Sequence, residues 1–242
     1  MFEEIRVLLS LLILSIAAIQ DMRNREVDDY LWMVGISLGG ALDAYALVVE
    51  RPTSTLLVRY LRFSIPFIIV LLASWGLKLM GEADILALIT LAVIQPLHPA
   101  GKCFFPPAFC SMIYSNLLIL LVPIIFLLWN AAHLLKGERI FDGFDEPLLR
   151  KVAASILAIA VRKESAEKFK YFTIAEKGSP PKKRFKLASA LSIPEKREGV
   201  PESRGPLIWI CPSIPLLPFI LGGYLLTMWV GDPILLLVNL IR

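Results

Sequence analysis

Long apolar runs separated by short polar links make up most of this chain. A helix that crosses a bilayer needs about 20 predominantly apolar residues. The runs that approach this length occupy residues 5–20, 30–49, 61–80, 110–129 (or 110–135) and 214–230. We expect each of these to be a membrane-spanning helix, and a proline within the third run, Pro66, predicts a kink there.

A further helix is predicted over residues 85–95, but it is short. Pro96 ends it after a rise of about 16 Å, which is roughly half a bilayer. Asp84 stands directly before it, where an N-cap is expected. Either this helix starts below the membrane surface, or the segment 96–109 re-enters the membrane. The sequence leaves both possibilities open.

The ends of the runs define the links. The first run is followed by Gln20-Asp21-Met22-Arg23 rather than by a small-residue cleavage site, so we interpret it as a retained helix and not a removable signal peptide. Residues 21–29 form a polar link, and Pro52 closes the second run. The apolar tail, 233–241, is too short to span a bilayer.

Residues 136–206 differ in character because they carry most of the chain's lysines and arginines. A helix is predicted over 148–161, and short strands over 171–175, 184–188 and 207–210. The predicted fold class is therefore an all-α polytopic membrane protein with about six transmembrane helices and a small cytoplasmic α+β insert between helices 5 and 6. The expected domains are 1–135, 136–206 and 207–242.

Composition supports this class. Hydrophobic residues make up 57% of the chain and charged residues 19%, which is too apolar for a soluble domain of this length. The formal charge of +4 is too small to indicate a nucleic-acid partner. The three cysteines, Cys103, Cys110 and Cys211, form no CxxC motif, so a zinc ribbon or disulfide framework is not expected.

The distribution of basic residues predicts the orientation. Arg23 and Arg25 lie in a short link, which the positive-inside rule places in the cytoplasm. Six spans with an outside N-terminus then put the 21–29 link, the turn at Gly81 and the basic insert on the cytoplasmic side. Asp21 and Asp84 share one face of the membrane in either orientation.

Acids within apolar surroundings are functional candidates by default, because a carboxylate at the bilayer centre costs about 2.5–3.5 kcal/mol on insertion scales. Two carboxylates 4 Å apart would repel by about 4 kcal/mol at an effective dielectric constant of 20. One of Asp21 and Asp84 would therefore stay protonated while the other remained a base. Such a pair can activate a water and polarise a peptide carbonyl, with no metal or cofactor required.

Two segments carry a resemblance to a known family. Gly81-Glu82-Ala83-Asp84 resembles the GxGD signature of membrane aspartic proteases, and the segment from Gln20-Asp21 to Val27 resembles the first-aspartate segment of archaeal preflagellin and type IV prepilin peptidases. The segment 209–215 is similar to the extended stretch that leads into the family's last helix. The resemblance covers most of residues 1–95 and 209–242 and leaves 136–206 uncovered.

The resemblance implies a protease that removes short basic leader peptides from pilin-like or archaellin precursors at the cytoplasmic face of the cell membrane. Asp21 and Asp84 match the family's catalytic aspartates. Gly81 and Ala83 would leave room for an extended substrate, although Ala83 stands where the signature has its second glycine. The cysteine-rich segment associated with methyltransferase activity in bacterial relatives is absent, so N-methylation of the product is not expected.

Four further acids lie on the predicted catalytic face and could receive the positive charges of a leader: Glu26, Asp28, Asp29 and Glu82. Glu82 is favoured as a solvated turn residue rather than a third catalytic acid.

Other interpretations stay open. Asp84 could simply cap a helix, and Asp21 could mark an interface. A transporter would also place acids in the membrane, but the chain has no internal repeat. A non-catalytic scaffold would tolerate loss of both aspartates. A serine protease is disfavoured, because neither His98 nor His133 is near a nucleophile motif. Since the aspartates belong to separate helices, substrate binding could involve a helix movement.

Overall fold

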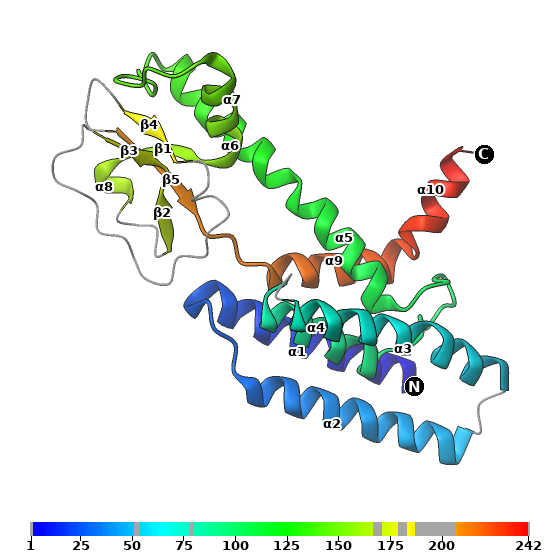
Figure 1. The fold of residues 1–242 in the computed structure, drawn as a ribbon. Coiled ribbons are helices and arrows are strands. Elements are labelled where there is room, and N and C mark those ends of the chain that lie inside the picture. The colour runs from blue at the N-terminus through cyan, green and yellow to red at the C-terminus, as the bar shows by residue number, and fades with distance from the viewer. Residues whose placement is uncertain are drawn as a thin grey trace. The chain divides into compact units, whose positions relative to one another are not determined.

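The computed structural model describes residues 2–50, 54–77, 80–166, 171–178, 183–186 and 207–241. It is mostly helical (Figure 1) and divides into two compact units. The first unit comprises Met1–Ile119 with Pro215–Arg242, and the second comprises Leu120–Ile214. The helical character predicted from the apolar runs is confirmed.

The first unit is a bundle of helices. Its elements are α1 (Phe2–Asn24), α2 (Asp29–Tyr45) with a π-helical turn (Ala46–Glu50), α3 (Ser54–Gly76), α4 (Glu82–Ile94), α5 (Pro107–Ile119), α9 (Leu217–Val230) and α10 (Pro233–Ile241). Helix α1 continues past the predicted end of the first run, so Asp21 lies in its last turns rather than in a link. The helical assignment of α3 runs through Pro66.

Three helical segments of the described residues are long and apolar enough to cross a membrane: Glu3–Asn24, Asp29–Val49 and Pro107–Leu135. Helices α9 and α10 meet at a bend of 56° and would give a fourth segment if they form one broken span. Length and composition therefore identify fewer spans among the described residues than the six predicted, and the number six stays a prediction. Helix α4 has 13 residues and is shorter than a span.

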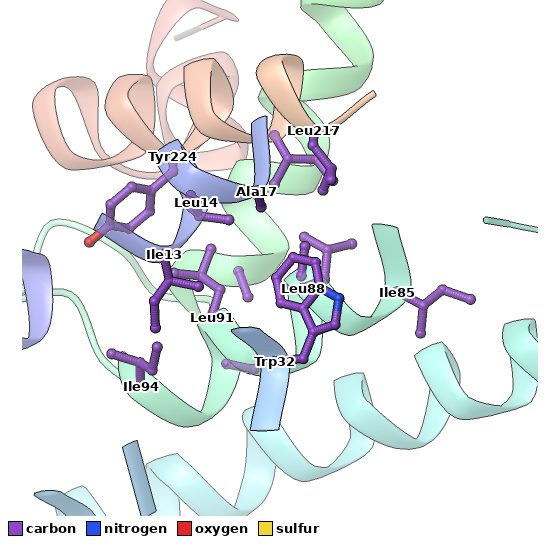
Figure 2. Packing of buried hydrophobic residues seen from close by; sticks show 14 of the residues in the cluster. Ile13, Leu14, Ala17, Trp32, Ile85, Leu88, Leu91, Ile94, Leu217 and Tyr224 are labelled. Atoms are coloured by element: carbon purple, nitrogen blue, oxygen red, sulfur yellow. The ribbon is translucent and has the colours of Figure 1, made fainter. Parts of the chain in front are cut away.

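Helix α4 lies at the centre of the first unit (Figure 2). Apolar residues surround its whole circumference, and a helix that is hydrophobic on all sides is stable only when it is buried. Helices α1, α2, α3, α5 and α9 supply its neighbours. The cluster includes Ile13, Leu14 and Ala17 of α1, Trp32 of α2, Ile85, Leu88, Leu91 and Ile94 of α4, and Leu217, Ile220 and Tyr224 of α9.

Glycines allow the helices to approach one another closely. A Cβ atom added at Gly39 of α2 would lie 3.0 Å from the backbone N and Cα of Ile94 in α4. One added at Gly223 of α9 would lie 2.3 Å from the carbonyl oxygen of Ser111 in α5. Small residues at such crossings are typical of membrane helices, whose association depends on close packing.

The C-terminal end of α4 is capped by a buried arginine. Arg6 of α1 donates a 2.7 Å hydrogen bond from Nη1 to the carbonyl oxygen of Ile94, and the same nitrogen lies 2.8 Å from Asp43 Oδ1 of α2. The last carbonyls of a helix have no partner within it, so a side-chain donor satisfies one of them. The charge of the arginine is neutralised by Asp43.

The second unit combines helices with two small sheets. Its elements are α6 (Leu121–Leu135), α7 (Leu148–Leu157), β1 (Ile159–Arg162), α8 (Lys163–Ala166), β2 (Phe172–Ile174), β3 (Glu176–Lys177), β4 (Arg184–Phe185) and β5 (Leu207–Pro212). The larger sheet is antiparallel, in the order β1-β5-β2, with Ala160 opposite Trp209 and Thr173 opposite Cys211. Strands β3 and β4 form an antiparallel pair.

The predicted strands over 171–175 and 207–210 are confirmed, and β4 confirms the start of the one over 184–188, of which residues 187–188 lie outside the described part of the chain. The helix predicted over 148–161 is wrong at its end, because it stops at Leu157 and β1 follows. Asn130 of α6 explains the change. Its side chain donates to the carbonyl oxygens of Ser155 and Ala158 and accepts the N–H of Ala160, so backbone groups that would continue the helix are bonded elsewhere.

Candidate active site

Asp21 lies near the C-terminal end of α1, and its side chain is 14% exposed. Oδ2 accepts a 3.2 Å hydrogen bond from the backbone N–H of Leu217. That N–H belongs to the first residue of α9, whose first amides have no partner within the helix. The N-terminal end of a helix also carries a partial positive charge, so α9 is a favourable neighbour for a carboxylate.

Arg25 follows Asp21 by one helical turn and ends α1. Its backbone N–H donates to the carbonyl oxygen of Asp21 at 3.1 Å, and its Nη1 lies 3.9 Å from Asp21 Oδ1. It has a φ of 61°, which is uncommon for a residue other than glycine and is typical of the position that closes a helix. The left-handed backbone thus terminates α1 with a guanidinium beside the carboxylate.

Asp84 lies in the first turn of α4 and is half-buried. Helix α4 begins at Glu82 with Gly81 as its N-cap, and the N–H of Ile85 donates to the carbonyl oxygen of Gly81. The prediction that Asp84 is the N-cap is therefore wrong. The helix starts at Glu82, two residues before Asp84, so Asp84 is one of its helical residues.

Gly81 is explained by the position of the Asp84 side chain. A Cβ atom added at Gly81 would lie 2.7 Å from Asp84 Oδ2, closer than real Cβ contacts. The backbone of Gly81 has φ −62° and ψ 143°, which any residue can adopt. The glycine is therefore needed for space and not for a special turn.

Asp21, near the end of α1, and Asp84, in the first turn of α4, are within electrostatic range of each other. Asp21 is near enough for its negative charge to act on the carboxyl group of Asp84, and burial strengthens that repulsion because little water screens it. The fold thus brings two acids that are 63 positions apart in the sequence close enough to interact through their charges.

The other predicted site residues lie on the flanking segments. Glu82 accepts a 3.2 Å hydrogen bond at Oε1 from Trp75 Nε1 of α3, and Ala83 packs against the core around α4. Asp28 is the N-cap of α2, and its N–H donates to Gln20 Oε1, next to Asp21 in the chain. Asp29 starts α2, and Glu26 is exposed in the link between α1 and α2.

Two partners of Asp21, the Arg25 guanidinium and the backbone N–H of Leu217, were not predicted from the sequence. The spacing of Asp21 and Arg25, four residues apart, is the usual signal for an ion pair on a helix and could have indicated the arginine. The Leu217 amide has no such signal, because a backbone group leaves no mark in the sequence beyond the prolines near the start of α9. Among the described residues, no group of three or more His, Cys, Asp or Glu side chains is placed to hold a metal ion.

The apolar helices indicate a helical membrane protein, with one acid near the end of α1 and another at the start of α4. No protein-family model matches the chain. A preflagellin peptidase of Methanococcus voltae is 23% identical over 236 residues, 94% of this chain and 95% of that protein. A preflagellin peptidase of Methanocaldococcus jannaschii is 24% identical over 237 residues, 92% of each. The chain is therefore a distant relative of the archaeal preflagellin peptidases, as the resemblance of its two aspartate segments predicted.

Proposed function

We propose that this protein is a membrane aspartic endopeptidase that removes leader peptides from archaellin or type IV pilin-like precursors. The proximity of Asp21 and Asp84 is the observation that carries the proposal. The names of the two relatives support the substrate class, because both are peptidases of preflagellin and match nearly the full length of this chain.

The two aspartates would share the work of peptide hydrolysis. The ionised carboxylate takes a proton from a water molecule while the protonated partner donates a hydrogen bond to the scissile carbonyl oxygen. The resulting hydroxide adds to the carbonyl carbon. When the tetrahedral intermediate collapses, the C–N bond breaks and the leaving amine takes a proton, so the pair again holds one proton between its members.

Neighbouring groups would keep this pair in position. The Leu217 N–H binds Asp21 Oδ2 and so fixes the direction of its carboxyl plane. Gly81 leaves the space that the Asp84 carboxyl group occupies. A fixed geometry of this kind matters because the reacting water has to contact both acids.

The test is cleavage of a purified leader-bearing precursor by the full-length protein in detergent or vesicles. Asp21→Asn and Asp84→Asn keep the shape of each side chain but remove its ability to act as a base, so we expect each to lower kcat by about 1,000-fold or more. Asp142→Asn, at an exposed position of the second unit, is the matched control and should leave cleavage unchanged. Thermal unfolding checks that the variants fold. Full turnover by either active-site variant would overturn the proposal.

Basic leaders would be recognised by the acids that surround the pair. Glu26 and Asp28 lie in the short link between α1 and α2, Asp29 is the first residue of α2, and Glu82 is the first residue of α4, two positions before Asp84. These negative charges would attract lysines and arginines that precede the cleavage site. We further propose that this face of the membrane is the cytoplasmic one, as the arginines of the same link predict.

Reversal of charge tests this recognition. Asp28→Lys combined with Asp29→Lys should lower kcat/KM for a basic leader by about tenfold, since each exposed ion pair contributes up to about 1 kcal/mol. The same variant should cleave a precursor with an acidic leader better than the wild type does. Equal processing of basic leaders by both proteins would exclude these residues from recognition without bearing on the catalytic pair.

A further inference from the structure

Helix α7 of the second unit carries an apolar stripe that the described residues of that unit leave exposed. Leu148 is 77% exposed, Leu149 81% and Val152 43%. At 100° per residue these three side chains lie within an arc of about 100° around the helix. Large apolar side chains exposed singly are ordinary, but a contiguous stripe of them marks a contact surface.

The opposite side of α7 holds it to the unit. Ala154 is buried there in the core of the second unit, and Asn130 of α6 donates hydrogen bonds of 3.0 and 2.8 Å to the backbone carbonyl oxygens of Ser155 and Ala158. Asn130 is itself almost fully buried. The stripe is therefore fixed facing outwards, and α7 cannot turn it inwards without breaking these bonds.

The attachment point of α7 lies at the end of a candidate membrane span. Asn130 belongs to the last two turns of the segment Pro107–Leu135. One residue earlier, Trp129 donates a 3.1 Å hydrogen bond to the carbonyl oxygen of Ala160, just beyond α7. Tryptophan is enriched where membrane helices meet the headgroup region. The same end of α6 exposes further leucines: Leu127, Leu128, Leu134 and Leu135.

We propose that α7 lies in the surface of the lipid bilayer, with Leu148, Leu149 and Val152 inserted among the acyl chains. The end of α6 that binds α7 through Asn130 belongs to a candidate span and exposes leucines of its own, which favours lipid over a protein partner. A helix with one apolar face and basic residues beside it is typical of such interfacial positions. Arg150, which follows Leu149 in α7, is 56% exposed although it pairs with Glu146, so its side chain can reach the headgroups. This contact does not depend on the proposed peptidase activity.

Site-directed fluorescence in vesicles tests the position of α7. In the full chain with Cys103, Cys110 and Cys211 replaced by alanine, Leu149→Cys is labelled with an environment-sensitive fluorophore. Glu164→Cys, at an exposed position of α8 in the same unit, is the matched control. The proteins are reconstituted into phosphatidylcholine–phosphatidylglycerol vesicles that contain either nitroxide-labelled acyl chains or external iodide.

We expect acyl-chain nitroxide to quench the label at position 149 at least about twofold more than the label at position 164, with the reverse order for iodide. Quenching of position 149 by iodide as strong as at position 164 would show that the stripe faces water and would overturn the proposal. Protection of position 149 from both quenchers would show that protein covers it, either a second copy or another chain, and would equally overturn the proposal. Val152→Cys provides an independent reading if the first label disturbs α7.

Discussion

Gly81 has no side chain, and the Asp84 carboxyl group occupies the space that a side chain there would need. A Cβ atom there would lie 2.7 Å from Asp84 Oδ2, and the backbone of Gly81 offers no conformational reason for glycine. A residue outside the proposed chemistry therefore determines where one of the two acids points. The neighbouring Ala83 has no such role, because its side chain packs against the core.

Gly81→Ala should displace the Asp84 carboxyl group and lower kcat by about 100-fold, the scale of loss that misplacing a reacting group by about 1 Å causes. Gly76→Ala is the matched control, since a Cβ atom at Gly76 meets nothing within 4 Å. Cleavage kinetics and thermal unfolding of both variants measure the effect. Normal kcat in Gly81→Ala would mean that the Asp84 side chain has another productive position.

The candidate site could be predicted from the sequence at the level of residue types but not of their partners. Asp21 and Asp84 stand out because acids at the ends of apolar runs are costly and rare. The hydrogen bond from Leu217 could not be predicted, since it joins a side chain to a backbone amide 196 residues away. The sequence favours Asp84 over Gly81 as the N-cap of α4, because aspartate is preferred to glycine at that position. The structure has Gly81 there instead.

At the scale of elements, close packing between α2 and α4 depends on particular glycines. A Cβ atom at Gly39 would come within 3.0 Å of the Ile94 backbone, whereas one at the adjacent Gly40 meets nothing within 4 Å. Backbone atoms cannot move aside as a flexible side chain can. The two neighbouring glycines should therefore respond in opposite ways to the same substitution.

Gly39→Ala should lower the free energy of unfolding by about 1–3 kcal/mol, because the added methyl group forces α2 and α4 apart. Gly40→Ala should raise it by up to about 1 kcal/mol, because alanine favours a helix over glycine. Denaturation in detergent micelles measures both. Equal effects of the two substitutions would show that α2 does not pack on α4 through Gly39.

Elements were predictable wherever a local pattern determines them. The apolar runs predicted most of the helices, and β-branched segments predicted β2 and β5. The strand β1 was missed because Ala158, Ile159 and Val161 continue the apolar pattern of α7, and only the distant Asn130 side chain ends the helix. Tertiary hydrogen bonds of this kind have no local signal.

At the scale of the whole molecule, the number of spans is the least predictable property. Apolar length alone does not distinguish a spanning helix from a buried one such as α4, which has 13 residues. Nor does it show whether α9 and α10, which meet at 56°, cross as one broken segment. Orientation, in contrast, is predicted by the arginines at one short link, and that prediction can be tested directly.

Cysteine accessibility measures that orientation. In the cysteine-free chain, Glu26→Cys should react with a membrane-impermeant maleimide in inside-out vesicles but not in whole cells, because its link is expected in the cytoplasm. Lys102→Cys, exposed in the segment between α4 and α5, is the companion position and should show the opposite preference. Labelling of Glu26→Cys in intact cells would reverse the orientation, and labelling of both positions from one side would change the number of crossings between them.

Helix α1 touches both ends of α4. Arg6 binds the carbonyl oxygen of Ile94 at one end, and the charge of Asp21 acts on Asp84 at the other. The stretch of α1 from Arg6 to Asp21 therefore has to match the length of α4. Inserting or deleting one residue in that stretch would turn Asp21 by about 100° around its axis and shift it by about 1.5 Å. Length changes in α1 should accordingly be excluded among relatives that keep the pair, while the links between helices are free to vary.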